Sequence, residues 1–68
     1  METINRNSEM PKSAQFAVLS NSGNFIQKFY SINEFGVLQF FGERGNWSAS
    51  EYKGISDIKN KVCKIKNN

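Results

Sequence analysis

The sequence predicts an α+β protein: a small antiparallel sheet of three to four strands, one C-terminal helix packed on one face, and a disordered N-terminal arm. Two observations predict this fold. Between residues 16 and 52, β-prone runs alternate with turn clusters of Asn, Ser and Gly. After Gly54 the apolar residues recur at spacings of three and four, which is the spacing of one helix face.

The length of the chain limits it to one domain. A protein of 68 residues and 7.8 kDa has a folded surface of roughly 4,400 Å² and one modest core. Residues 1–13 are polar and end near Pro11, so they are expected to form a flexible N-terminal arm. Residues 14–68 are expected to form a single small α+β domain.

The strands are expected in the middle of the chain. Phe16–Leu19 and Phe25–Ile32 are predicted to form a hairpin, because a cluster of turn residues separates them. Val37–Phe41 is the third strand. Trp47–Tyr52 contains few β-branched residues and is expected at an edge of the sheet.

The C-terminal segment is predicted to be a helix with Ser56 as its N-cap. On a helix, one stripe would hold Ile55, Ile58, Val62 and Ile65. The competing interpretation is a pair of short strands, Gly54–Ile58 and Lys61–Lys66, around a turn at Asn60.

The composition argues against an enzyme. The chain has no histidine, and Cys63 is its only cysteine, so zinc sites, redox pairs and internal disulfides are not expected. A general base would have to be a carboxylate or lysine with a strongly shifted pKa, which needs a desolvated cleft. No cofactor or metal is expected. The longest uninterrupted apolar run is Phe16–Leu19, so we expect a cytoplasmic protein without a membrane partner.

The positive charge lies at the C-terminal end. Residues 1–52 carry four basic and five acidic side chains, whereas residues 53–68 carry five lysines and one aspartate. Clustered lysines bind the phosphate groups of nucleic acids, which suggests a nucleic-acid-binding function. On a helix, however, these lysines would surround the apolar stripe and form a solvated surface. The lysines concerned are Lys53, Lys59, Lys61, Lys64 and Lys66.

The aromatic content predicts a protein partner. Aromatic residues make up 13% of the chain, and one helix can cover only one face of the sheet. The other face would then be an apolar patch, which is typical of an interface. A glycine-bounded loop next to Trp47 adds two charged side chains. The predicted partner-binding residues are Glu43, Arg44, Trp47, Tyr52, Tyr30 and Phe41.

These observations predict a non-catalytic small binding protein that occupies a larger protein or protein complex, or that forms a homodimer. In size and in its Asn-, Lys- and Ile-rich composition, the chain is similar to short accessory proteins of phages and other mobile elements. Some of those proteins are inhibitors of host defence or host enzymes, so this resemblance implies an accessory or inhibitor function. The alternative is a small basic nucleic-acid-binding protein that uses the C-terminal lysines.

Overall fold

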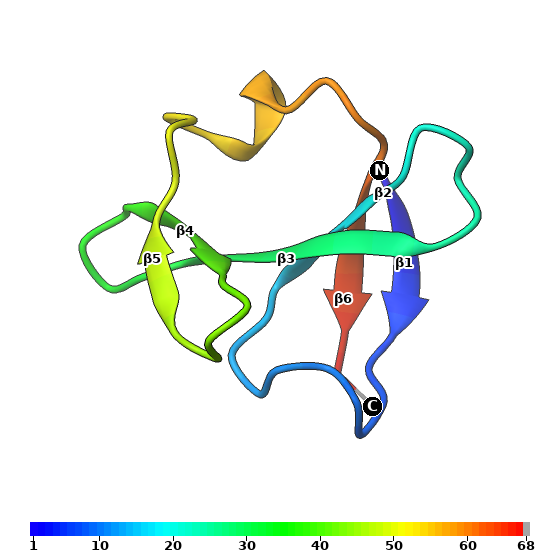
Figure 1. Ribbon diagram of the computed structural model, residues 1–68, viewed down its shortest axis with the longest axis horizontal. Coiled ribbons are helices and arrows are strands. Elements are labelled where there is room, and N and C mark those ends of the chain that lie inside the picture. The colour runs from blue at the N-terminus through cyan, green and yellow to red at the C-terminus, as the bar shows by residue number, and fades with distance from the viewer. Residues whose placement is uncertain (68) are drawn as a thin grey trace.

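The computed structural model describes residues 1–67, which form one six-stranded mixed sheet with the order β1-β6-β2-β3-β4-β5 (Figure 1). The first and last strands of the chain, β1 and β6, pair in parallel, and the other neighbours are antiparallel. A short 3-10 helix, η1, lies before the last strand. The elements are β1 (Glu2–Asn5), β2 (Phe16–Leu19), β3 (Ile26–Ile32), β4 (Leu38–Phe41), β5 (Trp47–Ala49), η1 (Ile55–Asp57) and β6 (Val62–Lys66).

The longest strand, β3, connects the two halves of the sheet. It pairs with β2 over residues 26–30 and with β4 over residues 30–32, so Tyr30 lies opposite both Phe16 and Phe40. Figure 1 shows β3 running across the molecule, with β4 and β5 at one end and β1, β2 and β6 at the other. Aromatic and β-branched residues at these positions suit a pleated, half-buried strand.

The sheet has two faces, and each is covered by a connection of the same chain. On the first, face A, Ala17 lies opposite Phe29 and Cys63, and the connection 6–15 covers it with Met10 and Ala14. On the second, face B, the connection 50–60 packs its apolar residues over the strands. Face B comprises Phe16, Val18, Tyr30, Leu38, Phe40 and Val62, covered by Tyr52, Ile55 and Ile58.

The prediction of a C-terminal helix is wrong. Residues 62–66 form strand β6, and η1 is only three residues long, so the described part of the chain is all-β and not α+β. The apolar residues expected on one helical stripe are divided between the two faces. Val62 belongs to the cluster on face B, whereas Ile65 belongs to the cluster on face A. Of the two strands in the competing interpretation, Lys61–Lys66 begins one residue before β6 and ends with it, whereas Gly54–Ile58 is not a strand.

The prediction of a disordered N-terminal arm is also wrong. Residues 2–5 form β1, which extends the sheet beyond β6. The following connection is packed, because Met10 is 8% exposed and Ala14 is completely buried. Strand β1 pairs with β6 at the other end of the chain. Because the two strands are far apart in sequence, no local pattern of residues indicates this contact.

The central strands lie close to their expected positions. Strand β2 coincides with the predicted run, while β3 and β4 each begin one residue later than predicted. Strand β5 is shorter than expected and lies at an edge of the sheet, as predicted. No helix within residues 1–67 is long and apolar enough to cross a membrane.

Candidate functional site

Three exposed apolar residues lie in or next to the turn between β3 and β4. Ile32 is 40% exposed, Phe35 is 81% exposed and Val37 is 44% exposed. Large apolar side chains that are exposed together are more informative than single ones, because they mark interaction surfaces. We call these three residues the tip patch.

The turn that carries the tip patch is fixed by hydrogen bonds from its own backbone. The Oδ1 atom of Asn33 accepts from the backbone N–H of Phe35 at 2.9 Å and of Val37 at 3.0 Å. The Asn33 carbonyl also accepts from the N–H of Gly36, whose φ of 79° favours glycine. Since these hydrogen bonds already order the turn, its backbone retains little conformational freedom.

A hollow of about 390 Å³ adjoins the tip patch on face A. Ile32 and Asn33 line one side of it, and Trp47 lines another. The Trp47 ring is held by an edge-to-face contact with Phe41, with ring centroids 5.2 Å apart. Polar side chains complete the lining, from Ser13, Gln15, Ser31 and Gln39.

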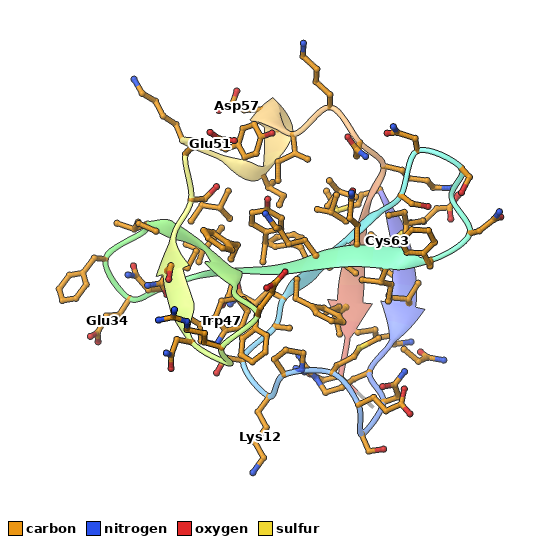
Figure 2. All side chains as sticks on the ribbon, in the orientation of Figure 1. Lys12, Glu34, Trp47, Glu51, Asp57 and Cys63 are labelled. Atoms are coloured by element: carbon orange, nitrogen blue, oxygen red, sulfur yellow. The ribbon has the colours of Figure 1, made fainter. Side chains whose placement is uncertain are left out.

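The charge beside the tip patch is negative. Figure 2 shows Glu34 projecting from the β3–β4 turn, away from the sheet, and Trp47 near β5. The surface therefore combines an aromatic projection, a carboxylate and a hollow that contains a tryptophan ring.

A second cavity, of about 440 Å³, lies on face B between β3 and the connection 50–60. Its aromatic lining comes from Tyr30, Phe40 and Tyr52. The Lys28 ammonium lies over the Phe40 ring, 4.6 Å from its centroid. The rest of the lining comes from Val18, Gln27, Ala49, Ser50, Glu51, Ile58 and Asn60.

Tyr30 is the least exposed aromatic residue in this cavity, at 4%. Burial raises the pKa of its phenol above the usual value, and the charges of Tyr52 and Glu51 act in the same direction. A side-chain hydrogen bond with Ser50 opposes this effect on the pKa. Tyr30, Tyr52, Glu51 and Ser50 all line this one cavity.

The structure does not bring the predicted partner-binding residues into one site. Phe41 and Trp47 contact each other beside the hollow on face A. Tyr30 and Tyr52 instead line the cavity on face B. The remaining two, Glu43 and Arg44, are exposed in the connection between β4 and β5.

Phe35 and Val37 are not among the candidate site residues that the sequence predicts. Phe35 stands between the predicted strands Phe25–Ile32 and Val37–Phe41, in a segment whose Asn33 and Gly36 are typical of a turn. Polar residues and glycine are typical of turns, so a phenylalanine there was the available signal.

The five C-terminal lysines are all exposed, and they lie in three different places. Lys64 and Lys66 alternate with buried residues along β6 and therefore share one side of the sheet. Lys59 and Lys61 line a polar hollow beside the turn at residues 20–23. Lys53 lies in the connection between β5 and η1.

Lys61 has an acidic neighbour on β1. Its ammonium donates to a carboxylate oxygen of Glu2 at 2.8 Å. This contact lowers the pKa of Glu2 and raises the pKa of Lys61. Both side chains are largely exposed, so the pair adds little stability.

Residues 1–67 contain no group of three or more Cys, Asp or Glu side chains placed to hold a metal ion. Comparisons with protein-family models, with curated proteins and with solved structures gave no match. The geometry defines a class of structure, a small all-β protein with a single mixed sheet covered on both faces by its own connections.

Proposed function

We propose that the protein is a non-catalytic binding protein that acts by occupying a larger protein through the tip patch and the adjoining hollow. The observation that carries this proposal is the position of Phe35, which is 81% exposed on a turn fixed by Asn33. Aromatic side chains presented on ordered backbone are frequent anchors of protein interfaces.

The surface also indicates the chemistry of the partner. Phe35 would enter an apolar pocket, and Trp47 at the hollow would receive an apolar side chain in return. Glu34 stands beside Phe35, so basic groups at the border of the partner's pocket would complement it. The partner is therefore a protein with an apolar pocket and a basic rim.

The test compares two exposed phenylalanines. Phe35 belongs to the tip patch, whereas Phe25, which is 61% exposed, lies outside it in the connection before β3. A partner is first recovered with the tagged protein from its native host after nuclease treatment and at about 0.3 M salt. Its affinity is then measured with purified components by calorimetry.

Phe35→Ser is expected to weaken this affinity by at least about tenfold, because hot-spot truncations cost about 2 kcal/mol or more. Phe25→Ser is expected to change it by less than about twofold. Equal losses for the two variants, or none for Phe35→Ser, would contradict the proposal. Thermal unfolding of each variant checks that the fold is retained.

Nucleic-acid binding is the second candidate, and the strand geometry of β6 favours it. Lys64 lies opposite Phe16 on the neighbouring strand, and Lys66 follows on the same side. Lysines beside an aromatic ring suit single-stranded nucleic acid. If the protein binds nucleic acid, fluorescence anisotropy of a labelled single-stranded oligonucleotide would show binding at about 0.05 M salt. This binding would be lost at about 0.3 M salt, and it would also be lost in the double variant Lys64→Gln/Lys66→Gln.

We further propose that the protein works in the cytoplasm as an accessory or inhibitor protein. Cys63 is free and buried, which suits a reducing compartment. The inhibitor function rests on the similarity in size and composition to short proteins of phages and other mobile elements. Occupying a pocket of a partner would be sufficient for inhibition.

A further inference from the structure

The cavity on face B already contains a cation from its own chain. The Lys28 ammonium lies 4.6 Å from the centroid of the Phe40 ring, within the distance at which a cation is attracted to an aromatic face. The Lys28 side chain is exposed, so it can leave the ring at little cost. Its position shows that the cavity accommodates a positive charge on an aliphatic chain.

The rest of the cavity has the complementary chemistry. The Glu51 carboxylate and the hydroxyl groups of Tyr30, Tyr52 and Ser50 provide hydrogen-bond acceptors. Figure 2 shows Glu51 on the connection that carries η1, the same connection that closes the cavity above face B. Aromatic rings together with a carboxylate form a favourable environment for ammonium or guanidinium groups.

We propose that this cavity is a binding site for a cationic side chain, an arginine or a lysine of a polypeptide partner, which displaces Lys28 from the Phe40 ring. The aliphatic part of the entering side chain packs against Val18 and Ile58. Its charged end then lies between Phe40 and Glu51. The site is separate from the tip patch, so it does not depend on the function proposed above.

The charges of the lining distinguish this ligand from others. An anion would meet Lys28 but would also meet Glu51, and Lys28 would have to leave its ring to pair with it. A purely apolar ligand would gain nothing from the Glu51 carboxylate, which is exposed. An entering cation replaces one cation–aromatic contact with another and adds an ion pair.

The experiment uses the full chain and four small probes. N-acetyl-arginine amide and N-acetyl-lysine amide are compared with the neutral N-acetyl-citrulline amide and the anionic N-acetyl-glutamate amide. Binding is followed by NMR, from the amide signals of residues 49–52 and the ring signals of Phe40 and Tyr52. The arginine and lysine probes are expected to give saturable shifts with dissociation constants of about millimolar size.

Two pairs of variants separate local from overall charge effects. Lys28→Met removes the internal cation and should tighten binding of the arginine probe about two- to fivefold. Lys12→Met makes the same change in net charge at a lysine that Figure 2 shows pointing away from the sheet, and it should leave the affinity almost unchanged. Glu51→Gln should weaken binding several-fold, whereas Glu34→Gln should not.

Three results would overturn the proposal. The first is equal binding of the citrulline and arginine probes, which would show that charge is not recognised. The second is an equal effect of Lys28→Met and Lys12→Met, which would show that Lys28 does not compete for the site. The third is preferential binding of the glutamate probe through Lys28, which would make the cavity an anion site.

Discussion

At the scale of single residues, Arg6 ties together the connection that covers face A and joins it to the C-terminal end of the chain. Its guanidinium donates to the carbonyl of Pro11 at 2.8 Å and to the carbonyl of Ala14, both in the connection that covers face A. It also donates to the side chain of Asn67 at 2.7 Å. Its three nitrogens, spread over one plane, each donate to a different acceptor, whereas a lysine would have to donate from a single nitrogen.

Replacing Arg6 should therefore destabilise the protein. Arg6→Met keeps an aliphatic chain but removes the donors, and the free energy of unfolding should fall by about 1.5–3 kcal/mol. Urea unfolding followed by Trp47 fluorescence measures this loss. Arg44→Met is the matched control, since Arg44 is exposed, and it should cost less than about 0.5 kcal/mol. Equal losses in the two variants would show that the Arg6 contacts add nothing.

Neither the hydrogen bonds of Arg6 nor the exposure of Phe35 could be predicted from the sequence. One contact of Arg6 joins residues 61 positions apart, and no local pattern indicates it. The exposure of Phe35 depends on which residues the sheet covers. The residue type of Trp47 marks it as an interface candidate, which stays a prediction, and the structure places it in the lining of the same hollow as Ile32.

At the scale of elements, β6 shows why the periodicity of the C-terminal segment was misleading. The spacing of three and four included Ile55 and Ile58 from η1 and its end, and Val62 and Ile65 from β6. These residues belong to two elements and contact both faces of the sheet. The alternation of buried Cys63 and Ile65 with Lys64 and Lys66 is the strand signal, and it appears once Cys63 is counted as apolar.

The hairpin strands were easier to predict, because their signal is local. Runs of aromatic and β-branched residues flank glycines, and Gly23, Gly36 and Gly45 adopt the positive φ that tight turns require. Strand β1 lacks such a signal. It has four residues, only Ile4 among them is strongly apolar, and its partner lies at the other end of the chain.

The connection 6–15 is expected to stabilise the fold as a cover over face A. Met10 is 8% exposed and packs in the same cluster as Ala17 and Ile65. Met10→Ala should lower the free energy of unfolding by about 2–3 kcal/mol, because it leaves a cavity in a small core. Chemical denaturation measures this change.

Met1→Ala is the control for this prediction, because Met1 is 72% exposed. It should cost less than about 0.5 kcal/mol. The rate at which a thiol reagent labels Cys63, which is 1% exposed, gives a second readout. Labelling should accelerate in Met10→Ala and not in Met1→Ala. If both variants kept the parental stability and labelling rate, the connection would not cover the sheet in solution.

At the scale of the whole molecule, the protein has a large surface for its mass. Its accessible surface is 5121 Å², against roughly 4,400 Å² expected for a compact protein of this size. The interior is divided between two clusters, one on each side of the sheet. Since each cluster is small, the total stability should fall in the lower part of the usual range, at about 3–10 kcal/mol for this length.

The order of strands predicts how this stability is distributed. Strand β2 is paired on both sides, with β3 and β6, and contains buried Ala17 and Val18. Strands β1 and β5 each have one partner and lie at the edges. Amide hydrogen exchange should therefore be slowest in β2 and in its partners β3 and β6, where it requires global unfolding, and faster in β1 and β5, which can open locally.

The stability of β3 also affects the turn that carries the tip patch. The turn between β3 and β4 is anchored on one side by the protected β3, so the amides of Phe35 and Val37, both bonded to Asn33, should exchange more slowly than those of an open loop. Asn33→Ala removes both bonds, and it should accelerate exchange at these two amides while leaving β2 protected. Exchange measured by NMR on both proteins tests this. Loss of protection throughout the sheet would show that the turn is part of the global fold and not a locally ordered support for Phe35.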